Sequence, residues 1–291
     1  MSTATDLRDA PVPGVSPAVY SEADFRAVAD IVRGVAGIML PPGKAMLVYS
    51  RLAPLVRQTG AATFAAYVAR IRQDAAEQAR AVAALSTNHT FFYREAHHFE
   101  HVAAEVRPHV LRRSEARQPV RLWSAGCSSG EETWSLVMTL LGPARGEGVE
   151  LARRDLLVLA SDLAPHAIAR ATAATYPVKD LDPVPPALVA GWMHAAGDGT
   201  MVVDDVARRL VRFRQLNLMH AWPMTGHFDA IFCRNVMIYF EPETNARLVD
   251  RFADALVPGG FLYIGHSERV TGAAAERFEA VGTTIYRKRD A

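Results

Sequence analysis

The chain has 291 residues, enough for two domains or one large one, and 50% of them are hydrophobic and 22% charged, as in an ordinary globular protein. Its formal net charge of +1 gives no bulk electrostatic case for nucleic acid or an anionic membrane as partner. No apolar run reaches the roughly 20 residues that span a bilayer, and the N-terminus lacks an apolar signal-peptide core. We therefore expect a cytoplasmic protein that is not inserted in a membrane. No large exposed apolar pattern demands a dimer, so we expect a monomer.

The two cysteines are Cys127 and Cys233. Two distant cysteines in a cytoplasmic chain are more typical of free thiols than of a disulfide. Without a CxxC pair or a nearby histidine partner they also argue against a zinc site. We expect no metal, and two reduced thiols packed on neighbouring strands.

Residues 1–20 are rich in Pro, Ala and Ser without periodicity, which predicts a disordered tail. Residues 21–95 carry only helical patterns and form a predicted helical N-terminal domain. Its first helix opens with Ser21 as N-cap and Asp24 three residues later, and Gly37 is a stop signal. Three more helices are predicted in "KAMLVYSRLAPLVRQTG", "TFAAYVARIRQD" and "AEQARAVAALS".

From residue 96 to 291, apolar strands alternate with helices, which predicts an α/β domain built on a mostly parallel, doubly wound sheet. The predicted strands are "PVRLWSAG", "DLLVLASD", "LVRFRQLNL", "FDAIFCRNV", "GGFLYIGHS" and "TTIYRKR". The segment from about 177 to 209 is rich in proline and too long for a plain connection. We expect it to be an inserted small subdomain that contains a short β-hairpin.

The loop "SAGCSSGEE" joins the first of these strands to the next helix, with Gly126 at its start and Gly130 before the helix. In such a sheet, ligands bind at the carboxyl ends of the strands. Glu131 and Glu132 at the helix start would repel a phosphate, so the loop favours a nucleoside-type cofactor with a cationic group, such as S-adenosylmethionine. Asp162, which ends the second strand, suits a ribose diol. The alternative is that these residues are helix caps and turn residues.

Several long motifs resemble the chemotaxis receptor methyltransferases of the CheR type over about residues 20–289. These are "GIMLPPGKAMLVYSRL", "STNHTFFYREAHHF", "WSAGCSSGEE", "FRQLNL", "FDAIFCRNVMIYF" and "PGGFLYIGHSE". The resemblance implies a helical N-terminal domain, a Rossmann-like methyltransferase domain and a small inserted β-subdomain. It also implies methyl transfer from S-adenosylmethionine, with S-adenosylhomocysteine as product, to glutamate side chains on the cytoplasmic signalling helices of chemoreceptors.

Carried over by motif, the resemblance implies the cofactor residues Asn88, Thr90, Arg94, Glu132, Asp162, Asn217, Leu218, Arg234 and Asn235. Glu131 stays open as an alternative to Glu132 for the cofactor ammonium. Arg94 can bind the methionine carboxylate bidentately, and its alternative role is a surface ion pair with Glu95 or another nearby acid. Asn217 can pair with the adenine edge.

A glutamate carboxylate is ionised at pH 7 and needs no general base to attack a sulfonium methyl group. The enzyme's work is therefore alignment and exclusion of water. Besides Arg94, Tyr239 is the candidate catalytic residue, because it can position the acceptor; its alternative is a buried aromatic. Lys44 and Arg51, seven residues apart, share a helix face with Arg57 nearby, and we expect them to dock the acidic receptor. A solvated basic face is the alternative.

Two features depart from the family pattern. Thr133-Trp134 stands where Pro-Tyr is usual, from which we expect a slight change in stability and retained binding. The segment "HAAGDGTMVVDD" is too short for the extension that grips a receptor C-terminal peptide, which favours independence from such a tether. Two other functions stay open: a degenerate cofactor-binding regulatory or scaffold protein, and a methyltransferase for a small carboxylic acid.

Overall fold

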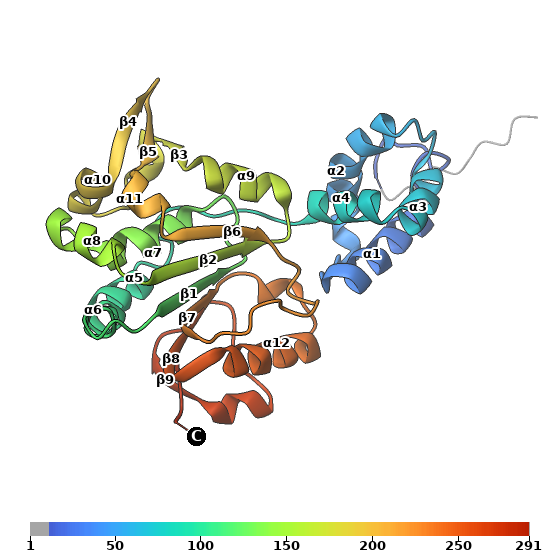
Figure 1. Ribbon diagram of the computed structural model, residues 1–291. Helices are drawn as coiled ribbons and strands as arrows, with labels where there is room; N and C mark the ends of the chain where they lie inside the picture. Colours follow the sequence, from blue (N-terminus) through green and yellow to red (C-terminus); the bar gives the residue numbers. More distant parts are fainter. Residues whose placement is uncertain (1–11, 291) are drawn as a thin grey trace, which may run out of the picture. The chain divides into compact units, whose positions relative to one another are not determined.

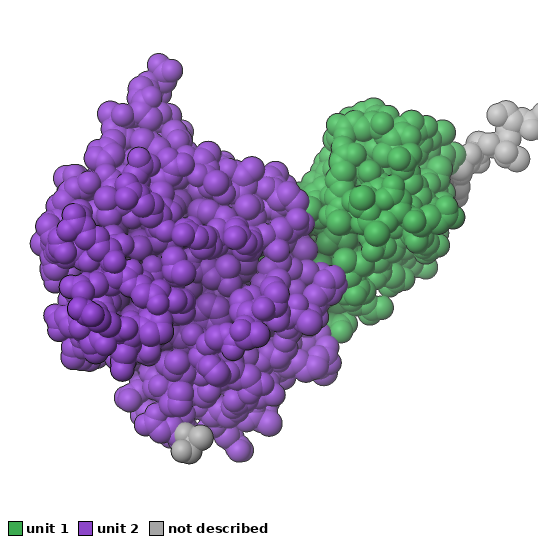
Figure 2. Space-filling view, in the orientation of Figure 1, with its two compact units in different colours: residues 1–87, 239–241 green, residues 88–238, 242–291 purple. Residues whose placement is uncertain are grey.

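The computed structural model of the chain describes residues 12–290 (Figure 1). The chain divides into two compact units (Figure 2). We call residues 1–87 with 239–241 the helical unit, and residues 88–238 with 242–291 the sheet unit.

Within its described residues, from Val12 on, the helical unit contains four α-helices and a short 3-10 helix before the second of them. Their bounds are α1 (Glu22–Ala36), η2 (Pro42–Lys44), α2 (Ala45–Gln58), α3 (Phe64–Gln73) and α4 (Ala75–Leu85). The start predicted for α1 is confirmed, because the Ser21 hydroxyl accepts from the Asp24 N–H while the Asp24 carboxylate accepts from the Ser21 N–H. Gly37 ends the helix in the left-handed conformation, at φ 72°.

The segment before α1 differs from the expected disordered tail. Residues 1–11 lie outside the described part of the chain, but Val12 and Tyr20 are buried. The Tyr20 ring lies 4.4 Å from that of Phe64, and its hydroxyl donates to the Ala45 carbonyl. Ordered structure therefore begins before residue 20, because the Tyr20 side chain packs into the core of the four helices.

The sheet unit is a seven-stranded sheet flanked by helices (Figure 1). The strands stand in the order β6-β2-β1-β7-β8-β10-β9. Those from β6 to β8 are parallel, whereas β10 runs antiparallel to both its neighbours. The strand bounds are β1 (Val120–Ala125), β2 (Leu156–Asp162), β6 (Val211–Gln215), β7 (Phe228–Cys233), β8 (Leu256–Ile264), β9 (Phe278–Gly282) and β10 (Ile285–Lys288).

The main helices of this unit fall into two groups along the chain. Those that precede β1 are α5 (His97–His101), η3 (Val102–Val106, a π-helix) and α6 (Arg107–Glu115). The others lie between strands further along the chain and are α7 (Glu131–Leu141), α8 (Arg145–Ala152), α9 (Pro165–Ala173), α10 (Pro186–Trp192), α11 (Asp205–Arg208) and α12 (Pro242–Ala255). From β1 the chain proceeds outward to β2 and β6, then returns to β7 on the other side of β1. The strand order thus reverses between β1 and β7, the place where open α/β sheets bind ligands.

A second, three-stranded sheet lies between α9 and β6 in the sequence. It has the order β3-β5-β4, with β3 (Thr175–Pro177), β4 (Met193–Gly197) and β5 (Thr200–Val203), all antiparallel. The hairpin of β4 and β5 falls inside the segment from about 177 to 209 that the sequence marked as an insertion.

Strand β9 was not foreseen in the sequence. In its segment FEAVG only Phe278 is buried, and the other four residues are exposed. An edge strand that buries one residue shows neither alternation nor an apolar run, so pattern reading misses it.

Candidate functional site

The loop after β1 depends on two glycines. Gly126 and Gly130 adopt φ of 89° and 98°, which favour glycine. A Cβ on Gly126 would come within 2.4 Å of the Val236 side chain, and one on Gly130 within 2.7 Å of the Tyr176 hydroxyl. The loop is therefore closely packed between β7 and the small sheet, and it turns its backbone toward the switch point of the sheet.

Asp162 joins this loop to residues far away in the sequence. Its buried carboxylate accepts from the N–H groups of Ser128 (2.8 Å) and Ala164 (2.9 Å) and from the Asn88 side-chain amide (3.3 Å). Burial raises its pKa, while these three bonds lower it and offset part of the rise. A carboxylate has about four acceptor positions, so capacity for a hydroxyl donor remains. The structure thus brings together Asn88 and Asp162, both candidate cofactor residues.

Arg234 is buried between two carboxylates. Its guanidinium lies 3.1 Å from Glu132 and 3.4 Å from Glu95, and it also donates to the Arg94 carbonyl. The Ser124 hydroxyl donates to the second Glu132 oxygen at 2.8 Å. Burial raises the pKa of Glu132, and Arg234 and Ser124 counteract this only in part. For Glu95 burial also acts to raise the pKa, but Arg234 and His266 outweigh it and hold the pKa at about 2.

Glu131 has separate partners. Its carboxylate accepts from the Ser129 hydroxyl at 2.7 Å and lies 3.9 Å from Arg170. Burial raises its pKa as well. With Glu132 bound to a guanidinium and Glu131 to a hydroxyl, both remain candidates for an ammonium group. Two carboxylates that share one guanidinium leave a net negative charge, which suits a cationic ligand and disfavours a phosphate.

The segment that carries Arg94 has an unusual backbone. Tyr93 and Glu95, on either side of Arg94, have φ of 54° and 60°, a conformation that costs energy in residues other than glycine. The Arg94 guanidinium donates to the His89 carbonyl at 3.2 Å and lies 5.7 Å from the centre of the Phe91 ring. Within residues 12–290 it forms no ion pair, so the alternative pair with Glu95 is not seen; Glu95 pairs with Arg234 instead.

Asn217 and Leu218 follow β6, and Asn235 follows β7. The Asn217 side-chain oxygen accepts from the Met219 N–H at 3.0 Å. The Leu218 carbonyl accepts from Trp222 and from Arg251 of α12. Asn235 has φ of 57°. These residues therefore follow the carboxyl ends of β6 and β7, which run parallel in the same sheet as β2, the strand that Asp162 ends.

Two further candidate residues, Thr90 and Tyr239, lie in different settings. Thr90 is half-buried in the segment between Asn88 and Arg94. Tyr239 belongs to the helical unit, where its carbonyl accepts from the Met39 N–H at 2.7 Å. Its role in positioning an acceptor stays a prediction.

The structure changes the interpretation of the predicted docking face. Arg51 is half-buried and donates to the carbonyls of Leu85 (3.1 Å) and Ser86 (2.6 Å), so it satisfies the end of α4. Lys44 and Arg57 are exposed. Lys44 immediately precedes α2 and Arg57 lies in its last turn, about 20 Å further along the helix axis, so the three cations do not form one continuous face.

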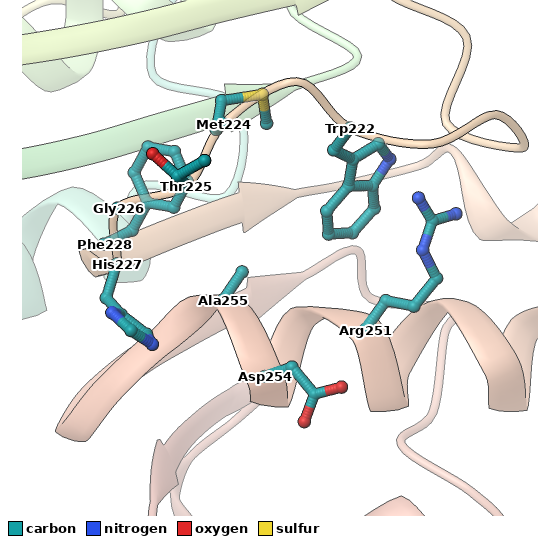
Figure 3. Close-up of a pocket in the computed structure, with 9 residues that line it drawn as sticks. All are labelled: Trp222, Met224, Thr225, Gly226, His227, Phe228, Arg251, Asp254 and Ala255. Carbon is teal, nitrogen blue, oxygen red and sulfur yellow. The ribbon is translucent and has the colours of Figure 1, made fainter.

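A surface pocket of about 300 Å³ lies beside the loop that precedes β7 (Figure 3). Trp222 and Arg251 stand at one end of it and His227 at the other. Arg251 stacks on the Trp222 ring at 3.9 Å and donates to the carbonyls of Leu218 and His220. The pocket borders the amino end of β7, so it is distinct from the site at the carboxyl ends of the strands. One of its lining residues, Arg251, is bonded to the loop that carries Leu218.

The cysteines match their expected placement. Both are buried and free, on or next to the paired strands β1 and β7, and burial raises the pKa of both thiols. Residues 12–290 contain no group of three or more His, Cys, Asp or Glu that could hold a metal ion. In the same range no helix is long and apolar enough to cross a bilayer.

Two carboxylates of this region were missed in the sequence. Glu95 belongs to the motif that carries Arg94, where the sequence suggests it only as an ion-pair partner of Arg94, and Glu268 belongs to the closing "GHSE", to which the sequence analysis assigns no role. Glu268 accepts backbone N–H groups from the loops after β7 and β8. Their positions within recognisable motifs were the available signal.

Two family models match nearly the whole chain. The SAM binding domain of CheR methyltransferases matches residues 88–287, and the all-alpha domain of CheR methyltransferases matches residues 23–86. The chain is 42% identical over 257 residues to a probable chemotaxis protein methyltransferase of Rhizobium etli, covering 87% of this chain and 94% of that protein. It is 37% identical to chemotaxis protein methyltransferase 2 of Pseudomonas aeruginosa, covering 95% and 96%. It is 35% identical to the chemotaxis protein methyltransferase of Salmonella typhimurium, covering 91% and 90%.

Proposed function

Since the chain belongs to the CheR methyltransferase family and its cofactor is S-adenosylmethionine, we propose that it methylates glutamate side chains on the cytoplasmic helices of chemoreceptors. The observation that carries the proposal is the arrangement of acidic groups at the sheet's switch point. There Glu132 and Glu95 share Arg234, and Asp162 lies beside Asn88.

The residues of the site fit the chemical groups of this cofactor. Asp162 suits the ribose diol, and the acid pair at Arg234 suits the positive charge. The Arg94 guanidinium suits the methionine carboxylate. Gly126 and Gly130 let the backbone approach closely, where any Cβ would collide with neighbouring side chains. The buried carboxylates of Glu131 and Glu132 at the start of α7 disfavour a phosphate there, which agrees with a cofactor that carries none.

The cofactor supplies a methyl group activated by a sulfonium. The glutamate carboxylate of the substrate is already ionised at pH 7, so this chain need not accept a proton. One C–O bond forms while one C–S bond breaks, and the bonding pair remains on sulfur, which becomes a neutral thioether. What the protein contributes is orientation and exclusion of water. We assign alignment to Arg94 and to Tyr239.

The Thr133-Trp134 departure does not favour a degenerate member. The Trp134 indole is buried and donates to the Ala171 carbonyl at 3.2 Å, and the buried Thr133 hydroxyl donates to Ser124 at 3.2 Å. Ser124 in turn holds Glu132. Thr133 therefore supports Glu132 through Ser124, and both Thr133 and Trp134 are part of the packed structure around the site.

The test is a methyl-transfer assay with S-adenosylmethionine labelled in its methyl group and membranes that contain the chemoreceptors of the source organism. Base-labile label on receptor bands supports the proposal. Binding of S-adenosylhomocysteine without transfer would indicate a regulatory or scaffold protein, and labelled small acids without labelled receptors would indicate a metabolic methyltransferase. An Asp162→Ala variant, which removes the proposed ribose partner, serves as the control for site-dependent labelling.

A further inference from the structure

Glu268 is a buried carboxylate whose side-chain oxygens accept only backbone N–H groups among the residues that the structure describes, while the neighbouring Arg269 guanidinium donates to the Glu268 main-chain carbonyl. It is 4% exposed and lies in the turn that follows β8. One oxygen accepts from the N–H groups of Met237 (2.7 Å) and Ile238 (3.2 Å), and the other from those of Gly265 (2.5 Å) and Asn235 (3.1 Å). Among the residues that the structure describes, it takes part in no ion pair.

These four donors belong to two loops at the carboxyl ends of neighbouring strands. Gly265 follows β8, and the other three form the turn after β7. Asn235 holds the left-handed conformation at φ 57°. A Cβ on Gly265 would come within 2.4 Å of the Asn235 side-chain nitrogen, so the two loops are in direct contact. Glu268 thus fixes the backbone on which Arg234 and Asn235 are carried.

A buried carboxylate without a cation is costly unless its hydrogen-bonding capacity is filled. Burial raises the pKa of Glu268, and the four N–H groups counteract it. An ionised carboxylate offers about four acceptor positions and no donor. An amide of the same shape presents an NH₂ group to two of these N–H groups, so glutamine cannot reproduce the arrangement.

We propose that Glu268 is a positioning residue for the cofactor: it fixes the turn that presents Arg234 and Asn235. The inference rests on the proposed function, in which these two residues contact the cofactor. Glu268 itself need not touch the ligand. Its action runs through the backbone of residues 235–238, so its loss should weaken cofactor binding beyond any general loss of stability.

Asp229 provides a matched control. It lies near the amino end of β7, whereas the turn follows the carboxyl end of the same strand, and like Glu268 it is 4% exposed. Its carboxylate accepts from the Arg121 N–H at 2.8 Å and from Arg113 at 2.6 Å. Asp229→Asn therefore removes a buried charge from β7 and leaves the turn after this strand with all its bonds to Glu268.

The experiment measures S-adenosylhomocysteine affinity by calorimetry, and thermal stability, for the full chain, Glu268→Gln and Asp229→Asn. We expect both variants to melt earlier. We expect Glu268→Gln to bind at least about tenfold more weakly, which corresponds to about 1.4 kcal/mol, and Asp229→Asn to bind within about twofold of the unmodified chain. Equal affinity of Glu268→Gln and the unmodified chain would overturn the inference. So would equal losses in both variants, since affinity would then follow stability.

If Glu268→Gln does not fold, Gly265→Ala tests the same point, because its methyl group displaces the Asn235 side chain directly. Tenfold weaker binding supports the inference, and unchanged binding overturns it. If the unmodified chain itself binds no S-adenosylhomocysteine, the proposed function fails together with the inference. If the unmodified chain binds and the variants bind equally well, only the inference fails.

Discussion

Replacing Arg234 by methionine removes the one cation that Glu132 and Glu95 share. Methionine keeps the length and apolar stem of the side chain, so the change isolates the charge. Removal of one partner from a buried ion pair costs about 3–5 kcal/mol, because the other charge stays buried and unpaired. For a unit of roughly 200 residues, a loss of 1 kcal/mol lowers the melting temperature by about 2–4 °C. We therefore expect Arg234→Met to melt roughly 6–20 °C below the unmodified chain.

A second substitution tests whether the loss of stability comes from the carboxylates of Glu132 and Glu95, which Arg234→Met leaves without their shared cation. Glu132→Gln in the Arg234→Met background removes one of the two negative charges and still accepts from Ser124. We expect this double variant to recover about 2 kcal/mol of the lost free energy of unfolding.

The stability of Arg234→Met should also depend on pH, with a definite sign. Without Arg234 the pKa of Glu132 rises further, and a carboxylate with a raised pKa in the folded state loses stability as pH rises. Arg234→Met should therefore be closer to the unmodified chain at pH 6 than at pH 8.

The assay is urea unfolding followed by tryptophan fluorescence. All four tryptophans, Trp123, Trp134, Trp192 and Trp222, belong to the sheet unit, so the signal reports on the unit that contains the site. A loss below about 1 kcal/mol in Arg234→Met would refute the reasoning, because that is the range of an exposed pair. A double variant no more stable than the single one would also refute it.

Burial, together with Arg234 and His97, lowers the pKa of His98 to about 3. A histidine that stays neutral in the folded state destabilises the protein as the pH falls below the unfolded-state pKa of histidine. For His98 this loss is about 2 kcal/mol of unfolding free energy between pH 8 and pH 5. His98→Gln should lack this part of the acid sensitivity in urea unfolding, and an unchanged pH profile would contradict it. Arg251→Lys removes the paired bonds to the carbonyls of Leu218 and His220. Calorimetry should then show S-adenosylhomocysteine binding about three- to tenfold more weakly. An unaltered affinity would show that the loop keeps its conformation without Arg251. Lys44→Glu should raise KM for a receptor fragment and leave KM for S-adenosylmethionine unchanged, and equal rises in both would exclude a docking role.

The layout of the sheet unit could be predicted because its buried parallel strands are apolar runs separated by helical patterns. The first helix was placed to the residue by its cap signals at Ser21 and Gly37. By contrast, the edge strand β9 buries only Phe278 and leaves no pattern. The role of Tyr20 was missed because a single aromatic in a Pro-rich segment has no periodicity.

The individual residues of the candidate site could be recognised from the sequence, but the contacts between them could not. Gly126 and Gly130 could be predicted from the chemistry of a tight loop. The contact between Asn88 and Asp162 spans 74 positions, which no local pattern encodes. The same holds for Arg234 with Glu132, and for Glu268 with the turn after β7. Arg51 shows another limit of sequence reading: helical spacing suggested a docking face, but its guanidinium donates to the carbonyls of Leu85 and Ser86 at the end of α4.

The most direct measurement of the central claim is mass spectrometry of a purified receptor cytoplasmic fragment after incubation with the protein and S-adenosylmethionine. The account predicts glutamate residues that carry one methyl group in place of the carboxylate charge, and loss of that group in mild alkali, which hydrolyses esters. Replacement of the modified glutamates by alanine should abolish the signal. An alkali-stable methyl group on nitrogen, or a receptor that stays unmodified while the protein binds S-adenosylhomocysteine, would contradict the account.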